Sequence, residues 1–368
     1  MAPLRIGFDR QIFCLMARGG ISRHFHDLIA GLADAGGTPE GPGRPLQPVL
    51  LFRCHANRHL QGRGLVRLPC LGYRLLRRLG CDLAASPSRL TGIDLLHATY
   101  YLGLPPQQQS CPLVSTLHDM TPERWPQFFP RGSPHGAKLA WFGASSRIVS
   151  VSASSAAHLV ELDPGLAERL RVIHLATGFA DQSPTPLTGL PRRPFFLYVG
   201  RREGYKNIDR LLEALVHLDG GDTAPQLLLV GGGPLRTAER KRLRLLGLQQ
   251  RVRAQAADDG QLAWLYRHCR AVLVPSLAEG FSLPLIEALA CDAPVVASDL
   301  TVHREIGGAF CDLLDPGDTE AWVLALRDRS RHVTPTRRLG PRALAELRRY
   351  FSLERLRADH RALYRSLA

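Results

Sequence analysis

The amino-acid sequence predicts an α/β protein with two domains, each built around a parallel β-sheet. Its 368 residues exceed the usual size of a single domain, and 45% of them are apolar, so each half can bury a core of its own. Short apolar runs alternate with helix-like stretches, as in parallel sheets that helices cover on both faces. A proline-rich segment, 181–194, is expected to link residues 1–180 to residues 195–349.

Five strands and one clear amphipathic helix are expected in the first half of the chain. The helix is predicted at 22–33, where apolar side chains between Phe25 and Leu32 recur at the spacing of one helical face. The strand Ser145–Ser152 leads into a second helix, which is expected to be capped near Ser154. The predicted strands are Leu4–Phe8, Asp94–Ala98, Leu113–Leu117, Ser145–Ser152 and Arg171–Ala176.

The second half repeats this alternation. A loop after the apolar run Ala271–Val274 leads to a helix at Leu283–Ala290, which Ser282 can cap and in whose first turn Pro284 costs no hydrogen bond. Further helices are expected at Leu262–Arg270 and over the basic end, Leu339–Ala368. The predicted strands are Phe195–Val199, Gln226–Val230, Val252–Ala256, Ala271–Val274 and Pro294–Ser298.

The net charge of +14, with a pI near 10.0, calls for an anionic partner, which could be nucleic acid, an anionic membrane or a phosphorylated ligand. The leucine- and arginine-rich segment 74–79 fits an anionic membrane surface; the alternative is the solvated basic face of a docked helix. None of the eight cysteines forms a C-x-x-C pair, and no apolar run approaches the roughly 20 residues that span a bilayer. We therefore expect reduced thiols and a cytoplasmic protein without a membrane span.

The stretch around Leu283–Ala290 carries the clearest chemistry. Glu279 lies in the loop and Glu287 about two helical turns later, so both carboxylates can face the carboxyl end of the sheet, where open α/β sheets bind ligands. The amides of Gly280, Phe281 and Leu283 lie at the helix N-terminus and suit a phosphate. A sugar nucleotide would satisfy both features, because carboxylates accept hydrogen bonds from vicinal hydroxyls. The plainer alternative is a buried strand with two solvated glutamates.

Polar clusters follow three strands of the first half and one of the second. Gly19 and Gly20 precede a helix and let the backbone approach a ligand, although a glycine pair is also a plain turn. His97 and His118 each follow a strand, where a single histidine is as often structural as functional. After the strand Phe195–Val199, Arg201 and Lys206 flank a turn, so two cations can converge on a diphosphate.

The stretch from Glu279 to Ala288, EGFSLPLIEA, resembles the E-G-F-G-L-P-x-x-E-A signature of the retaining glycosyltransferases of family 4, with Ser282 in place of the commoner glycine. Three other stretches are similar to motifs of a subgroup that assembles cell-surface polysaccharides. They are D-x-Q-I-F with G-G-I-S-R (9–23), H-x-T-Y-Y (97–101) and T-x-H-D-M (116–120). Two more, G-R-x-x-x-x-K-N at 200–207 and G-G-G-P at 231–234, resemble elements of the family as a whole.

The resemblance implies the GT-B fold, two Rossmann-like domains with parallel sheets facing a central cleft, and a terminal helix, 350–368, that crosses back to the first domain. It places Glu279 on the donor sugar, Glu287 on the ribose, and His118 near the reaction centre. The diphosphate is assigned to Arg201 and Lys206, with the loop of Gly19, Gly20 and Arg23. Further donor-binding residues are Gly232, Gly280, Phe281, Ser282 and Leu283, and His97, Tyr100 and Asp119 form the acceptor side.

The expected function is a hexosyltransferase, with mannose as the favoured sugar, that works on a polysaccharide or lipid-linked acceptor by same-face displacement. No cofactor is expected besides the donor substrate, and no metal, because no D-x-D pair follows a strand. We expect a peripheral position on the inner face of the plasma membrane and no nucleic acid partner. The alternatives are a sugar-nucleotide epimerase, a phosphorylase-like enzyme with pyridoxal phosphate, and a non-catalytic basic protein that binds nucleic acid or membranes.

Overall fold

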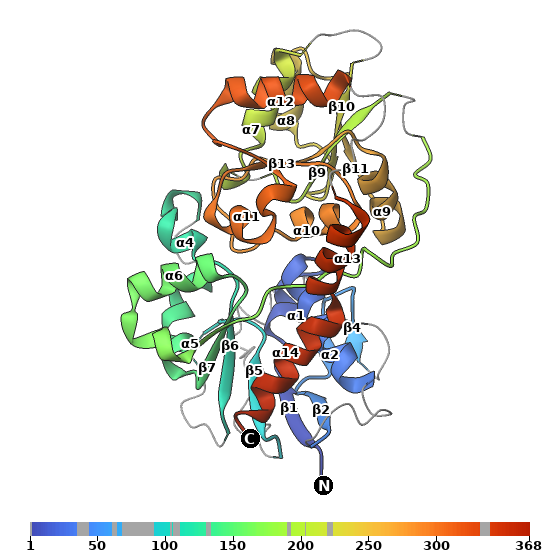
Figure 1. Ribbon diagram of the computed structural model, residues 1–368. Helices are drawn as coiled ribbons and strands as arrows, with labels where there is room; N and C mark the ends of the chain where they lie inside the picture. Colours follow the sequence, from blue (N-terminus) through green and yellow to red (C-terminus); the bar gives the residue numbers. More distant parts are fainter. Residues whose placement is uncertain are drawn as a thin grey trace. The chain divides into compact units, whose positions relative to one another are not determined.

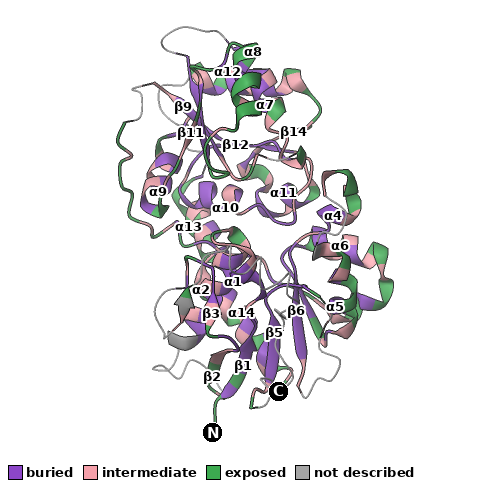
Figure 2. Cartoon of the chain, turned by 180° about the vertical axis from the view of Figure 1, so that it is seen from behind, coloured by how far each residue is buried: buried purple, intermediate pink, exposed green. Residues whose placement is uncertain are grey.

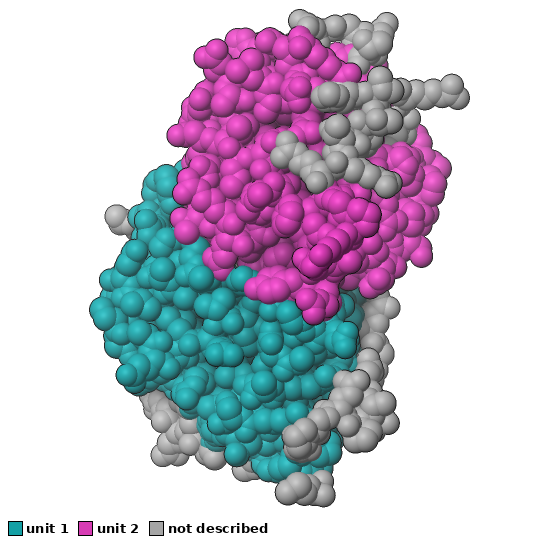
Figure 3. All heavy atoms as spheres, viewed as in Figure 1, with its two compact units in different colours: residues 1–176, 353–368 teal, residues 177–352 magenta. Residues whose placement is uncertain are grey.

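The computed structural model describes residues 2–34, 44–60, 65–67, 92–103, 105, 111–129, 134–189, 193–202, 204–218, 224–331 and 339–368. The chain packs into two compact units (Figure 3). Unit 1 comprises Met1–Ala176 and Leu353–Ala368, and unit 2 comprises Thr177–Ser352. Each unit contains one six-stranded parallel sheet (Figure 1).

The sheet of unit 1 has the strand order β2-β1-β5-β6-β7-β8. Every residue of β5 and β6 is buried, as Figure 2 shows, which fits central strands covered on both faces. The strands are β1 (Leu4–Phe8), β2 (Leu46–Leu50), β5 (Leu95–Ala98), β6 (Leu113–Leu117), β7 (Arg147–Ser150) and β8 (Leu170–Val172), and a separate pair is formed by β3 (Cys54–His55) and β4 (Val66–Arg67).

The helices of unit 1 come from both ends of the chain. They are α1 (Gln11–Leu15), α2 (Gly20–Asp34), α4 (Thr121–Arg124), α5 (Lys138–Ala144), α6 (Ala153–Leu162) and α14 (Leu353–Arg365), with short 3₁₀ turns η3 (Pro126–Phe128), η4 (Pro134–Ala137) and η5 (Pro164–Arg169).

Helix α14 packs against α2 within unit 1, although more than 300 residues separate them in sequence. Its Leu356 and Tyr364 are buried in the same core as Phe25 of α2. Arg357 donates a hydrogen bond of 3.1 Å to the carbonyl oxygen of Asp27. A Cβ atom at Gly31 would collide with the Arg357 side chain, so glycine allows the two helices to approach closely at this point.

The sheet of unit 2 has the strand order β11-β10-β9-β12-β13-β14, so β9 and β12 are neighbours on either side of the point where the order reverses. Leu197 pairs there with Val272. Ligands bind at the carboxyl ends of the strands beside such a switch point. The strands are β9 (Phe195–Val199), β10 (Gln226–Val230), β11 (Val252–Gln255), β12 (Val272–Val274), β13 (Val295–Ser298) and β14 (Asp312–Leu314).

The helices of unit 2 lie mostly between these strands in the chain, and the last two follow β14. They are α7 (Ile208–Val216), α8 (Thr237–Leu245), α9 (Asp259–His268), α10 (Leu283–Ala290), α11 (Thr301–Ile306), α12 (Thr319–Arg331) and α13 (Pro341–Tyr350), with 3₁₀ turns η6 (Gly204–Lys206) and η7 (Gly308–Phe310). Asp258 caps α9, because its side chain accepts from the Gln261 amide while the Gln261 side chain accepts from the Asp258 amide.

Several expected elements are present with the predicted bounds, among them β1, β6, β9, β10 and α10. The cap predicted near Ser154 is Ser152, whose hydroxyl accepts from the Ser155 amide at 3.0 Å. The capping prediction for α10 was wrong. Ser282 precedes α10 in a left-handed conformation and its side chain accepts no capping hydrogen bond. The predicted terminal helix is divided into α13 and α14 around Phe351 and Ser352.

None of the helices in the described ranges combines the length and the apolar character needed to cross a bilayer. The membrane-surface segment predicted at 74–79 lies outside the described residues. Among the cysteines that the structure describes, all six are free thiols, namely Cys14, Cys54, Cys111, Cys269, Cys291 and Cys311.

Candidate active site

An ion pair lies at the switch point of unit 2. Lys206 Nζ is 2.7 Å from Glu279 Oε1, and Ser276 Oγ donates to the same oxygen at 2.7 Å. Burial alone would lower the pKa of Lys206, but the attraction of Glu279 outweighs burial and raises it, so the ammonium stays charged. Sequence analysis assigned both residues to the donor, and the fold brings them into contact across 73 positions of sequence.

The loops that carry this ion pair are tied to each other. Asn207 Nδ2 donates to the Pro275 carbonyl oxygen at 3.1 Å, and the Leu277 amide donates to the Tyr205 carbonyl oxygen at 2.8 Å. Asn207 itself has a left-handed backbone with φ 53°, which asparagine tolerates better than most residues. The loop after β9 and the loop after β12 therefore form one bonded layer at the carboxyl end of the sheet.

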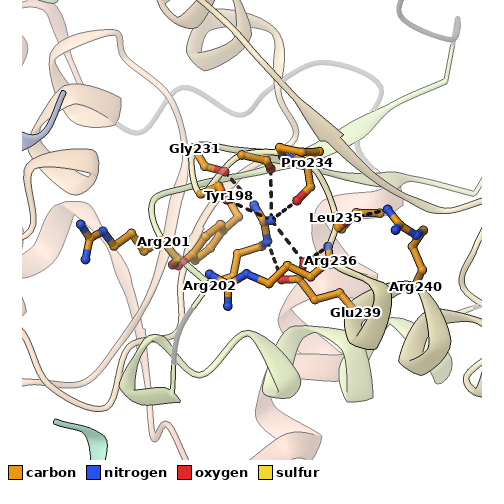
Figure 4. Close-up of polar contacts among 11 residues, drawn as sticks. Tyr198, Arg201, Arg202, Gly231, Pro234, Leu235, Arg236, Glu239 and Arg240 are labelled. Atoms are coloured by element: carbon orange, nitrogen blue, oxygen red, sulfur yellow. Dashed lines mark hydrogen bonds and ion pairs between the residues drawn. The ribbon is translucent and has the colours of Figure 1, made fainter. Parts of the chain in front are cut away.

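Arg201 and Arg202 follow β9 directly and differ in environment. Arg201 is exposed, and Figure 4 shows its side chain pointing away from the contacts of Arg202. The hydroxyl of Tyr198 donates to the Arg201 carbonyl oxygen, which fixes the backbone at this point. The second predicted cation is thus on the same loop as Lys206, with its guanidinium accessible to solvent.

Glu287 is not the solvated glutamate of the plainer alternative. It is 7% exposed and accepts a hydrogen bond of 2.8 Å from the Tyr266 hydroxyl, from α9 to α10. Burial, followed by the charge of Glu287, raises the pKa of Tyr266, which keeps this hydroxyl a donor. The carboxylate is therefore held rigidly inside unit 2, and its assignment to the ribose stays a prediction.

The turn before α10 contains Ser282, the one residue of this stretch that departs from the family signature. Ser282, where glycine is commoner, has φ 87° and ψ 73°, a region in which glycine avoids a steric cost. Its hydroxyl is buried and has no hydrogen-bond partner. Phe281 is 4% exposed, and Leu283 is the first residue of α10, with Pro284 in the first turn. The turn is therefore held in place although residue 282 is not glycine.

Sequence reasoning missed His303 of α11. It is fully buried, and its Nδ1 is 2.7 Å from the Ser298 carbonyl oxygen at the end of β13, so Nδ1 carries the proton and Nε2 is an acceptor without a partner. Burial lowers its pKa, and the charges of Glu279 and Lys206 act on it as well. The sequence contained one signal: His303 follows the strand β13, whose carboxyl end lies at the same edge of the sheet as the carboxyl ends of β9 and β12.

In unit 1, the D-x-Q motif forms a buried network between β1 and β5. Asp9 Oδ1 accepts from the Thr99 amide at 3.1 Å and from the Thr99 hydroxyl at 2.5 Å, and Asp9 Oδ2 accepts from Gln11 Nε2 at 2.6 Å. Gln11 Oε1 in turn accepts from the Leu102 amide. Burial raises the pKa of Asp9 to about 6, against the effect of these hydrogen bonds. The motif therefore joins the two strand ends.

Gly19 and Gly20 lie at the start of α2. Gly20 is the first residue of the helix, and the Gly19 carbonyl oxygen accepts from the Ser22 hydroxyl at 3.0 Å. The structure thus gives both glycines a local structural use, and their contact with the donor stays a prediction.

Four buried histidines gather in unit 1, and we call them the histidine cluster: His24 of α2, His97 of β5, His118 after β6 and His360 of α14. The ring centroids of His24 lie 6.4 Å from His118 and 5.8 Å from His360, and His97 lies 5.9 Å from His360. Burial lowers the pKa of all four, to about 4 for His118 and His360. Each ring is therefore neutral at pH 7.

The residues predicted for the acceptor side are engaged within unit 1. His97 has both ring nitrogens bonded, Nδ1 to the Tyr364 hydroxyl at 2.6 Å and Nε2 to the Thr116 hydroxyl at 2.8 Å, which is the environment of a core histidine. Tyr100 is 7% exposed and its ring is stacked on that of His118, with centroids 6.3 Å apart. Asp119 Oδ1 accepts from the Thr121 amide at 3.0 Å.

His118 differs from His97 in its bonding. Its Nε2 is buried and has no hydrogen-bond partner, and the charge of Asp119 opposes the lowering of its pKa by burial. Within the described part of the chain, no group of three or more histidine, cysteine or carboxylate side chains could hold a metal ion.

Two family models match most of the chain between them. One is described as "Glycosyltransferase Family 4" and covers residues 18–177; the other is described as "Glycosyl transferases group 1" and covers residues 188–330. The boundary between the two matches falls near the boundary between unit 1 and unit 2.

Relatives with curated names are 27–30% identical over part of the chain. A D-inositol 3-phosphate glycosyltransferase 1 of Catenulispora acidiphila is 30% identical over 279 residues, which are 66% of this chain and 66% of that relative. An O-antigen chain mannosyltransferase B of Escherichia coli is 27% identical over 237 residues, 56% of this chain and 58% of that relative. The chain therefore spans about three fifths of the length of these relatives.

Solved structures match the whole chain at low identity. A sucrose-phosphate synthase from Thermosynechococcus elongatus has a TM-score of 0.70 at 21% identity, covering 100% of this chain and 99% of that one. Anabaena HepE, solved in complex with UDP and glucose, has a TM-score of 0.69 at 18% identity, covering 99% and 100%. These similarities confirm the predicted GT-B fold.

Proposed function

Because the chain belongs to glycosyltransferase family 4, we propose that it is a retaining hexosyltransferase that moves a sugar from a nucleotide diphosphate to a polysaccharide or lipid-linked acceptor. The observation that carries the proposal is the pair of Lys206 and Glu279 at the switch point of unit 2. A cation and a carboxylate side by side suit a donor that has a diphosphate next to a sugar.

Each residue of the site has a role in this proposal. Lys206 and Arg201 neutralise the departing diphosphate, so that a metal ion is not required. Glu279 accepts hydrogen bonds from the donor sugar and Glu287 from the ribose. In unit 1, His118 is the candidate for contact with the donor sugar, because its unbonded Nε2 can still accept or donate a hydrogen bond.

The proposed reaction retains the configuration of the sugar. The bond between the anomeric carbon and the diphosphate oxygen breaks, and the acceptor oxygen bonds to the same face of that carbon. The acceptor proton passes to the departing phosphate oxygen, so no side chain is needed as the base. Glu279 stays in place during this step, because Lys206 and Ser276 both hold its Oε1.

The names of the relatives guide the choice of substrates. The names of the O-antigen and serotype-specific mannosyltransferases point to mannose as the sugar and, in this proposal, to a lipid-linked or polysaccharide acceptor. The name D-inositol 3-phosphate glycosyltransferase points instead to a small phosphorylated acceptor. We place mannose and a lipid-linked or polysaccharide acceptor ahead of a small phosphorylated acceptor, because the motifs of unit 1 resemble the polysaccharide-assembling subgroup. A cytoplasmic location at the inner face of the membrane belongs to the same proposal.

A thermal-shift panel tests the donor site. GDP, UDP, ADP and dTDP are added in EDTA and in magnesium to the wild type, Lys206→Ala and Lys241→Ala, the last being an exposed lysine of α8 that serves as the matched control. A ligand at about 100 times its Kd stabilises the native state by about 2.7 kcal/mol. We expect one nucleotide to stabilise the wild type and the control in EDTA, and Lys206→Ala to lose the shift.

Turnover separates the alternatives. The proposal predicts that donor is consumed only with acceptor, and that the new linkage has the anomeric configuration of the donor by NMR. Consumption without acceptor would indicate an epimerase or hydrolase instead. If no nucleotide stabilises the wild type and a salt-sensitive complex forms with DNA, the basic-binder alternative replaces the proposal.

A further inference from the structure

Arg202 is the more buried of the two arginines after β9. Its side chain is 2% exposed, whereas the neighbouring Arg201 is exposed. The G-R-x-x-x-x-K-N motif specifies Arg201 and leaves position 202 open, so it does not predict this difference in burial. A nearly buried guanidinium requires partners for its five N–H donors.

The partners of Arg202 are four consecutive carbonyl oxygens and one carboxylate, as Figure 4 shows. Nη1 donates to the Gly231 oxygen at 2.7 Å, and Nη2 lies 3.4, 3.1 and 3.1 Å from the oxygens of Gly232, Gly233 and Pro234. Nε donates to Glu239 Oε1 at 2.8 Å. A lysine could not replace this fork, because its three donors radiate from one atom.

The loop that Arg202 contacts begins with three consecutive glycines. Gly231, Gly232 and Gly233 all have left-handed backbones, with φ of 89°, 66° and 75°. A Cβ atom at Gly231 would lie 3.0 Å from the Gly200 carbonyl oxygen, and one at Gly232 would lie 2.8 Å from Arg202 itself. The close approach therefore requires glycine, and glycine leaves the loop free to adopt other conformations.

Glu239 extends the same contact to the start of α8. Its Oε2 accepts from the Arg236 amide at 2.6 Å, which closes the first turn of the helix, while its Oε1 accepts from Arg202. Hydrogen bonds and the charge of Arg202 lower the pKa of Glu239 despite some burial, so the pair is ionised at pH 7. One ion pair thus fixes both the glycine loop and the helix that follows it.

We propose that Arg202 is a positioning residue for the nucleotide of the donor. It holds the loop Gly231–Pro234, at the carboxyl end of β10 next to the switch point, in the single conformation that receives the nucleotide. Its guanidinium is paired with Glu239 and does not contact the diphosphate. In this proposal Arg201 neutralises the diphosphate and Arg202 holds the loop. The inference rests on the proposed function, since it presumes that a nucleotide binds at this end of the sheet.

The test compares four variants with the wild type. Arg202→Met removes the fork, Arg202→Lys keeps the charge without it, and Arg242→Met removes an exposed arginine of α8 as the matched control. The readouts are amide exchange of residues 230–236 without ligand, the Kd of the nucleotide that stabilises the wild type, and the KM values for donor and acceptor. Glu239→Gln is the fourth variant; it removes the ion pair and leaves one side-chain oxygen in place of the two that accept from Arg202 and Arg236.

We expect Arg202→Met and Arg202→Lys to raise the exchange of the loop and to weaken nucleotide binding about tenfold, with the donor KM raised and the acceptor KM unchanged. Glu239→Gln should show a smaller change in the same direction, and Arg242→Met none. Equal nucleotide affinity in Arg202→Met and the wild type would overturn the inference alone. Failure of the wild type to bind any nucleotide would instead overturn the proposed function, and the inference with it.

Discussion

Acid should unfold unit 1 through its histidine cluster, because four imidazoles are buried there in the neutral form. The folded-state pKa of His118 and of His360 is about 4, against 6.5 in the unfolded chain. Between these values the unfolded state binds more protons, so stability is present above pH 6.5 and is lost as the pH falls toward 4. At 1.36 kcal/mol for each pH unit, each of the two rings contributes about 3 kcal/mol to this loss.

The pKa values of about 4 already include the effects of the neighbouring charges. Asp119 opposes and Lys138 reinforces the lowering at His118, and Asp359 and Arg355 do the same at His360. His24 and His97 add losses of the same sign. Asp9 has the opposite sign, because its pKa is raised from 3.8 to about 6, so it contributes stability at low pH that is lost as the pH rises through about 6.

A variant isolates the histidine effect from these other groups. His360→Phe keeps an aromatic ring beside His24 and His97 but removes one titrating group. Urea titrations at pH 4.5 to 7.5 are monitored by amide exchange in the peptides of α2 and α14, because these peptides report on unit 1 alone. The free energy of unfolding of the wild type, relative to His360→Phe, should fall by about 3 kcal/mol as the pH is lowered across this window. A difference that stays constant with pH would refute the reasoning.

Three further outcomes follow from unit 2. Glu279→Gln removes the charge beside Lys206 and should lower kcat at least about 100-fold, while circular dichroism shows an unchanged fold. Ser282→Gly should raise the free energy of unfolding by about 1 kcal/mol in urea titrations, because it relieves a left-handed backbone; a loss of stability would contradict this account. Tyr266→Phe removes the hydroxyl that donates to the buried Glu287 and should lower the free energy of unfolding by about 1–3 kcal/mol, whereas an unchanged urea midpoint would contradict this account.

The strands that sequence reasoning found are those whose burial on both faces makes them continuous apolar runs. Strands β9 and β10 were predicted with their observed bounds for this reason. Strand β2 was missed because Pro48 interrupts it, which is tolerated only since β2 lies at the edge of the sheet. Strand β14, at an edge of the unit 2 sheet, was also missed. Its three residues are half-buried and too few to show a recognisable strand pattern.

The candidate site shows the same division. Spacing in the sequence could bring Lys206 and Glu279 together, since both follow central strands and the carboxyl ends of parallel strands meet at one edge of the sheet. Spacing could not show that Arg202 is buried while Arg201 is exposed, because the burial of two neighbouring arginines depends on what the fold places beside each of them. That difference comes from Glu239, 37 residues further along, which gives Arg202 a carboxylate partner.

The histidine cluster makes the point most sharply. His97 lies near the end of β5 and His118 directly follows the neighbouring strand β6, and the motifs around them assign both to a ligand. In the fold, the hydroxyls of Tyr364 and Thr116 use both nitrogens of His97, and one of these partners lies 267 residues away on the last helix. His118 keeps an unbonded Nε2. The two rings therefore differ in the partners that the fold supplies to His97, and those partners come from parts of the chain that local spacing does not include.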